Sequence, residues 1–254
     1  MMLPKMIRLP MMVSTIIVTT ASCLFAQAVP DQTELTAADP SQPQLMTLTV
    51  EQWPADGLLK LNGPLPSIIK VWLADDSQQT PLEFRFNPTA TEITIVLPTA
   101  PNPPAESVTL NFLITEKSTL HPDGVYVLSA LDATVEGTQA ALETHPGSHR
   151  IGFWNRAEDF VTWEADLPVG EYQVELVYSR ATGTGTQIDV QVGPATLGVT
   201  LEKTGSWYHY RVMPIGKVKI EKKGPHPVEI HVRKILNGGV MNLKAFALTP
   251  ISDS

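Results

Sequence analysis

The chain has 254 residues, 43% of them hydrophobic and 17% charged, with 18 Lys and Arg against 26 Asp and Glu. This acidic balance excludes the basic surface that nucleic acids or anionic membranes require. The only cysteine is Cys23, so no disulfide framework supports the fold, and the chain is long enough to depend on its hydrophobic core.

The first 28 residues have the three parts of a secretory signal peptide. Lys5 and Arg8 form a positive start, residues 11–25 are mostly apolar, and Ala26-Gln27-Ala28 is a small-residue cleavage motif. We therefore predict a secreted or periplasmic protein whose mature chain begins at Val29 and contains no transmembrane segment.

Two other interpretations of the leader stay open. The apolar run would serve as a membrane anchor, although it is shorter than the roughly 20 residues of a span and contains several Ser and Thr. Alternatively, Cys23 would carry a lipid, although Thr20 stands where a lipoprotein motif usually has Leu.

Residues 29–44 are polar and lack apolar periodicity, which predicts a flexible spacer. Beyond them, apolar residues alternate with polar ones, and turn-forming Gly, Pro and Asn separate the runs. This pattern is typical of half-buried antiparallel strands, so we predict an all-β protein of two antiparallel β-sandwich domains, the second a jelly roll. The boundaries that we expect are 45–118 and 125–251. The strand candidates of the first domain are 45–51, 68–74, 81–86, 91–97 and 107–115.

The first domain carries a specific pair of motifs. Trp53-Pro54-Ala55-Asp56-Gly57 ends a strand and makes a tight turn, because Pro cannot donate to a ladder and Asp-Gly favours turns. A second strand closes on Leu97-Pro98, and a proline-rich stretch precedes Val108. Over about 70 residues this pattern resembles the small C-terminal β-sandwich of bacterial α-L-fucosidases.

That resemblance also predicts an absence. The fucosidases carry their catalytic carboxylates on a preceding (β/α)8-type barrel, which takes about 200 residues or more. Residues 29–44 leave no room for one, and α/β alternation is missing. We therefore expect no enzyme activity.

The second domain resembles carbohydrate-binding jelly rolls of the CBM6/CBM35 type, which are galactose-binding-like folds. The similarity covers nearly the whole segment and rests on Leu128–Ala133, Ile151-Gly152-Phe153-Trp154, Asp159–Trp163, Pro168–Val174, Thr204-Gly205-Ser206-Trp207 and Met241-Asn242-Leu243.

The resemblance implies a ligand site at Trp207 and Asn242, which match the aromatic and amide of the family's cleft. Asn237, Tyr208 and His209 are nearby hydrogen-bonding candidates. Trp207 follows a Thr-Gly-Ser turn, which favours exposure near a loop end and stacking on a sugar ring. Core packing of Trp207 and a loop-capping role for Asn242 stay open as alternatives. We predict that Trp154 and Trp163 pack in the core.

Many such modules hold a structural calcium with acidic residues near their first and last strands. Here the matching positions are Leu131 and Lys244. Calcium requires oxygen ligands, so we expect no metal and no cofactor. Lys244 is instead a candidate partner of Asp132 or another acid of the first strand.

The sequence gives little support for a metal site or for glycosidase chemistry. His145 and His149 are separated by Pro146 and Gly147, which rules out metal spacing on a helix face. The neighbouring carboxylates of Glu158-Asp159 and of Asp75-Asp76 point to opposite faces of a strand, which is unsuitable for glycosidase chemistry.

These patterns predict a secreted, non-catalytic accessory protein that binds extracellular, fucosylated or related glycans. The alternative is a structural or interaction module that docks to a separate glycoside hydrolase or a cell-surface partner. A hydrolase of unfamiliar type is a third, weaker hypothesis.

Overall fold

The computed structural model describes residues 14–16, 33–34, 44–62, 67–87, 92–99, 107–121, 123–145 and 147–251. The predicted cleavage site and nearly all of the predicted leader and spacer lie outside this part. Two described strands belong to them: β1 (Ser14–Ile16) pairs in parallel with β3 (Gln44–Val50), and β2 (Thr33–Glu34) pairs in parallel with β4 (Leu58–Asn62). Within the described residues, no helix is long and apolar enough to cross a membrane.

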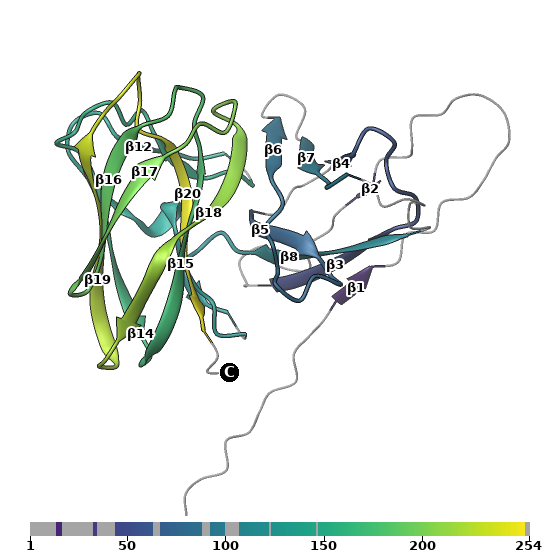
Figure 1. Ribbon diagram of the computed structural model, residues 1–254, viewed down its shortest axis with the longest axis horizontal. Coiled ribbons are helices and arrows are strands. Elements are labelled where there is room, and N and C mark those ends of the chain that lie inside the picture. Colours follow the sequence, from purple (N-terminus) through teal and green to yellow (C-terminus); the bar gives the residue numbers. More distant parts are fainter. Residues whose placement is uncertain are drawn as a thin grey trace, which may run out of the picture.

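The prediction of an all-β, antiparallel sandwich fold is confirmed (Figure 1). The first half contains β3 (Gln44–Val50), β4 (Leu58–Asn62), β5 (Ile68–Leu73), β6 (Phe84–Asn87), β7 (Glu92–Val96), β8 (Val108–Ile114) and β9 (Thr119–Leu120). The second half contains β10 (Tyr126–Ser129), a 3-10 turn (Ala130–Asp132), β11 (Thr134–Glu136), β12 (Ala141–Glu143), β13 (Arg150–Gly152), β14 (Phe160–Leu167), β15 (Gly170–Ser179), β16 (Thr186–Val192), β17 (Ala195–Leu201), β18 (His209–Ile220), β19 (Gly224–Lys234) and β20 (Asn242–Pro250).

We call residues 44–114 the N-terminal sandwich. Its two layers are β3–β8–β5 and β6–β7–β4, and their inward side chains share one core, which includes Leu48, Leu61 and Phe112. Strand β4 was absent from the five predicted strands. The candidate over 81–86 begins at Phe84 instead, after Pro81, which has no N–H to give to a ladder.

We call residues 126–250 the C-terminal sandwich. One layer is β12–β13–β20–β15–β18, the other is β11–β14–β19–β16–β17, and a second core fills the space between them. Trp154 and Trp163 are buried in this core, as predicted. The Trp163 indole N–H donates to the Ser129 carbonyl at 2.9 Å, which satisfies its one polar group.

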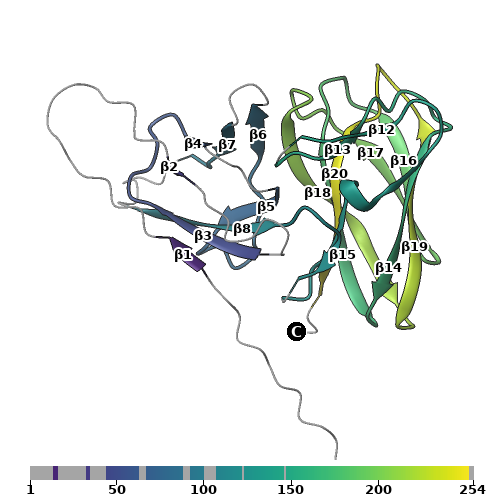
Figure 2. The same ribbon diagram turned by 180° about the vertical axis from the view of Figure 1, so that it is seen from behind.

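The two sandwiches share a sheet. Strand β6 pairs with the start of β18, through His209↔Arg85 and Tyr210↔Phe84, so the sheet continues from the C-terminal sandwich into the N-terminal one. Figures 1 and 2 show the N-terminal sandwich lying against β18 and β15 in both views.

The N-terminal sandwich therefore covers part of the sheet face that points away from the C-terminal core. Because side chains alternate along a strand, Val174 and Leu176 face the C-terminal core while Glu175 and Val177 face the N-terminal sandwich. The sequence pattern predicts a solvated polar face for β15. Contact with the N-terminal sandwich buries Glu175 and Val177 of that face instead, and Glu175 is only 4% exposed.

Candidate functional site

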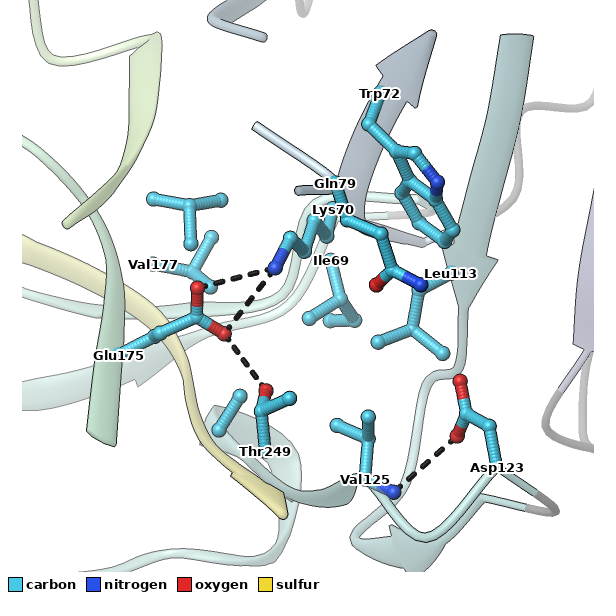
Figure 3. A pocket seen from close by; sticks show the side chains of 12 residues that line it. Ile69, Lys70, Trp72, Gln79, Leu113, Asp123, Val125, Glu175, Val177 and Thr249 are labelled. Carbon is cyan, nitrogen blue, oxygen red and sulfur yellow. Dashed lines mark hydrogen bonds and ion pairs between the residues drawn. The ribbon is translucent and has the colours of Figure 1, made fainter. Parts of the chain in front are cut away.

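A first hollow lies between the sandwiches. Its volume is about 10 Å³, enough for roughly one water molecule. Figure 3 shows Lys70 and Glu175 pointing toward each other across it, with Nζ 3.1 Å from Oε1, while the Thr249 hydroxyl donates to the same carboxylate at 2.9 Å. This ion pair joins the two sandwiches and leaves no room for a ligand.

A second hollow is an open cleft of about 350 Å³ at one end of the C-terminal sandwich. This volume lies within the roughly 300–1,000 Å³ of typical small-molecule sites. The β12–β13 pair and the segments before β18 and β20 meet there. The lining residues are Glu143, Arg150, Phe153, Trp154, Asn155, Trp207, Tyr208, Gly239, Met241 and Asn242.

Two side chains hold the Trp207 backbone in place through hydrogen bonds to its carbonyl. Its carbonyl accepts from Ser179 Oγ on β15 at 2.7 Å and from Asn242 Nδ2 on β20 at 2.8 Å. The half-buried indole extends toward Gly239, where an added Cβ would lie 3.3 Å from Cη2 of the ring. The loop is thus fixed to two strands while part of the ring stays accessible.

Phe153 is the second aromatic of the cleft, and 65% of its surface is exposed. Its φ is +51°, a left-handed conformation that bulky residues rarely adopt. Asn155 Nδ2 donates to the Phe153 carbonyl at 3.1 Å and supports this backbone. Such outliers concentrate at functional sites. Phe153 lies in one of the sequence motifs but was not among the predicted site residues, because residue types alone do not reveal a positive φ at Phe.

The adjacent Trp154 turns the opposite way. It is 1% exposed, and its indole N–H donates to the Asp159 carbonyl at 3.0 Å. The Asp159 carboxylate accepts backbone N–H groups of Thr138, Gln139 and Ala140, so this member of the Glu158-Asp159 pair supports a loop. The left-handed turn at Phe153 therefore separates an inward aromatic from an outward one.

Glu143, Arg150 and Asn242 form the polar wall of the cleft, and Gly152 lies next to Glu143 and Asn242. An added Cβ there would overlap Glu143 Oε1 and would lie 3.0 Å from Asn242 Oδ1, so a larger residue would have to displace the Glu143 carboxylate. Glu143 accepts two hydrogen bonds from Arg150, from Nη2 at 2.7 Å and from Nε at 3.2 Å. The Arg150 guanidinium also lies 5.1 Å from the centre of the Tyr208 ring.

The structure brings together three of the five residues selected from the sequence, namely Trp207, Tyr208 and Asn242. Asn237 does not line the cleft: it is exposed, has φ +58° and lies beside Gly183. His209 is also outside, with Nε2 2.8 Å from Glu83 Oε2 on the N-terminal side. Burial lowers the pKa of His209 despite this carboxylate.

The suggested pairing of Lys244 with Asp132 or another acid of the first strand is wrong. Lys244 is 2% exposed and donates to Ser67 Oγ and to the Gly147 carbonyl, both at 3.0 Å, while Asp132 accepts the N–H of Ser118. Burial, and then the nearby Arg150, lower the pKa of Lys244 to about 7. No group of three or more metal-ligating side chains occurs among the described residues.

The sequence matches no protein-family model and no curated protein. Its fold is similar to a family 35 carbohydrate-binding module from Clostridium thermocellum, with 19% identity, a TM-score of 0.43, and coverage of 50% of this chain and 98% of the module. A family 6 module from Cellvibrio mixtus lichenase 5A, solved with cellotriose, shows 21% identity, a TM-score of 0.40 and coverage of 50% and 97%. The insecticidal crystal protein Cry2Aa shows 16% identity, a TM-score of 0.42 and coverage of 61% and 28%. Carbohydrate-binding modules of families 35 and 6 are thus among the structural neighbours of about half of the chain.

Proposed function

We propose that this protein is a secreted or periplasmic, non-catalytic accessory protein that binds glycans in the cleft at the end of the C-terminal sandwich. The observation that carries the proposal is the pairing of two accessible aromatics, Phe153 and Trp207, with the hydrogen-bonding groups of Glu143 and Asn242 in one cleft. In this proposal residues 45–118 and 125–251 are the two domains, and the glycan is bound by the second.

The chemistry of the cleft suits a sugar ring. A pyranose has an apolar face of C–H groups, which packs on an aromatic ring, and hydroxyls at its edge, which seek acceptors. Binding sites typically combine such aromatic walls with a few polar groups. Asn242 Nδ2 is engaged by the Trp207 carbonyl, so Oδ1 is the amide atom offered to a hydroxyl. Glu143 Oε1 lies close to it above Gly152.

The N-terminal sandwich packs on the sheet of the C-terminal sandwich, which favours a glycan site at the loop end. Val177, Val212 and Ala247 on the outer face of β15, β18 and β20 pack against the N-terminal sandwich, so a ligand has no access to that part of the sheet face. The loop-end cleft opens beside this contact, and Tyr208 takes part in both.

We further propose that the glycan is fucosylated or related to such glycans. The support is the resemblance of the Trp53–Gly57 and Leu97-Pro98 motifs to the tail of α-L-fucosidases. The 6-methyl group of fucose also offers apolar surface to Phe153 or Trp207. The alternative role, docking to a separate glycoside hydrolase, stays the second hypothesis.

The test is a glycan array probed with wild type, Trp207→Ala and Phe153→Ala. Val169→Ala is the matched control, because Val169 is 60% exposed but lies at the other end of β15 from the cleft. We expect binding to fucosylated glycans that both aromatic variants lose and the control keeps. Absence of glycan binding, with a hydrolase co-purifying from the native source, would favour docking. Sugar release by the pure protein would contradict the non-catalytic role.

A further inference from the structure

The two charged side chains that line the cleft neutralise each other. Of the ten lining residues, Glu143 carries the one carboxylate and Arg150 the one guanidinium. The two hydrogen bonds between them use both carboxylate oxygens and two nitrogens of Arg150. Paired in this way, they form a fork-to-fork contact, the geometry in which Arg and carboxylate bind each other most specifically.

Arg150 offers no accessible donor to an anionic ligand. Its side chain is 3% exposed, Nε and Nη2 donate to Glu143, and Nη1 is buried without a hydrogen-bond partner. Packing over the Tyr208 ring further restricts its movement. An incoming carboxylate or sulfate would have to displace Glu143 from the guanidinium.

The other nearby cations do not line the cleft. Lys244 is fully enclosed behind the cleft and donates to Ser67 and Gly147. Arg156, near the lining residue Asn155, lies 3.5 Å from Glu158. By contrast, Glu143 keeps 19% of its side chain exposed, so the accessible charge of the wall is the acidic one. Neutral hydroxyls can donate to Glu143, whereas a second anion beside it is repelled.

We infer that the cleft selects neutral saccharides over uronic acids and sulfated sugars, and that Glu143 determines this preference by occupying Arg150. This inference rests on the proposed glycan binding and narrows it: among fucosylated glycans, the unsulfated ones are the ligands.

The experiment compares matched ligand pairs by calorimetry with the full mature chain. The pairs are galactotriose against trigalacturonate, and an unsulfated fuco-oligosaccharide against its sulfated form. We expect the neutral member of a bound pair to bind about tenfold more tightly or better. Its affinity should stay constant as NaCl rises from about 0.01 to 1 M, since screening acts on charged partners.

Glu143→Gln tests the determinant. It leaves the Arg150 cation without a carboxylate partner, so the ratio of acidic to neutral affinity should rise about tenfold, even where the neutral member loses a hydroxyl contact to Glu143. Glu136→Gln is the matched control, because it removes an exposed carboxylate from β11, in the other layer of the same sandwich, and should leave both affinities unchanged. The wild-type pairs and the salt series require no variant, so they decide the question even where Glu143→Gln folds poorly.

The outcomes separate the two levels of the proposal. Tighter binding of the acidic member, lost in Trp207→Ala, overturns the neutral preference and leaves glycan binding in this cleft intact. An unchanged ratio of acidic to neutral affinity in a folded Glu143→Gln variant overturns the role of Glu143. Failure of every saccharide to bind overturns the proposed function and this inference with it.

Discussion

At the scale of single residues, the cleft depends on one short segment, residues 150–155. Arg150 pairs with Glu143, Gly152 leaves space for the polar wall, Phe153 points outward and Trp154 points into the core. Side chains along β13 (Arg150–Gly152) point alternately to the two faces of the sheet. The left-handed residue at 153, directly after the strand, ends this alternation, so Phe153 and Trp154 have different environments. The segment thus concentrates both the binding groups and the backbone strain.

The strain at Phe153 leads to a prediction. Glycine adopts positive φ without a steric penalty, whereas an L-residue there costs about 1–2 kcal/mol. Phe153→Gly and Phe153→Ala should both lose glycan affinity, but the glycine variant should be more stable than the alanine variant by about 1 kcal/mol. Urea denaturation of the two variants measures this difference. Equal or lower stability of the glycine variant would show that the backbone at 153 is not strained.

Gly152→Ala should damage the cleft directly. Its Cβ would overlap Glu143 Oε1, so the carboxylate must move away from Asn242 and Arg150. We expect a stability loss of about 1–3 kcal/mol, as in other overpacked sites, and a weaker glycan affinity. Gly170→Ala is the control, because its Cβ meets only contacts of 3.4 Å or more. Similar losses in both variants would argue against a specific role for Gly152.

Lys244 should make stability depend on pH. Its pKa is lowered from 10.5 to about 7 in the fold, so between these values the unfolded chain binds more protons and stability rises with pH. Lys244→Met removes this dependence. The variant should therefore gain stability relative to wild type at pH 6 and lose that advantage toward pH 10, as measured by urea unfolding across the range. A difference between the two proteins that is independent of pH would contradict the shift.

At the scale of elements, the segment that carries Trp207 and Tyr208 is held from two sides. Ser179 and Asn242 bind the Trp207 carbonyl, and on the other side the Phe86 N–H of β6 donates to the Tyr208 carbonyl at 2.9 Å. Glu83, just before β6, adds contacts to His209 and Arg211 on β18. The N-terminal sandwich therefore helps to position the aromatic side of the cleft.

Phe86→Pro should weaken glycan binding from outside the cleft. Proline removes the N–H that holds Tyr208, a hydrogen bond worth about 1 kcal/mol. Phe86→Leu keeps the N–H and most of the buried apolar surface, so it is the matched control. Calorimetric titration should show a several-fold weaker affinity for the proline variant than for the leucine variant. Equal affinities would mean that β6 does not position the loop.

The sequence was most informative where one face of a strand is apolar. Its alternation predicted the all-β fold, most strands and the burial of Trp154 and Trp163. It was less informative where tertiary contact decides the environment: Glu175 has the pattern of a solvated residue, and only the packing of the N-terminal sandwich buries it. Phe153 lines the cleft because of its backbone conformation, and Glu143 lines it because β12 pairs with β13. Neither feature can be predicted from residue types. Trp207 and Asn242 were found through their motifs.

At the scale of the whole molecule, the two sandwiches behave as one packed body. Val177, Val212, Ala245 and Ala247 of the C-terminal sandwich belong to the same buried cluster as the core of the N-terminal one. Sheet pairing through β6 and β18 and the Lys70–Glu175 ion pair join them further. Scanning calorimetry should accordingly show one cooperative transition rather than two.

The Lys70–Glu175 pair allows a sharper test of this contact. Lys70→Met leaves the Glu175 carboxylate buried without its cation, which should destabilise the protein by about 3–5 kcal/mol. Adding Glu175→Met should recover most of that loss, because two apolar side chains can replace a buried ion pair. Unfolding free energies of the single and double variants give the comparison. No recovery in the double variant would mean that Glu175 contributes through other contacts, such as that with Thr249.

The shared sheet also has a mechanical consequence. Carbohydrate-binding units joined by flexible linkers sweep a wide volume, and tethering one of them hardly orients the other. Here β6 continues the sheet that supports the cleft, so a body attached to the N-terminal sandwich would aim the cleft in one fixed direction. The C-terminal sandwich is therefore poorly suited to fusion with other proteins as an isolated domain. Removing the N-terminal sandwich would expose an apolar sheet face that promotes self-association.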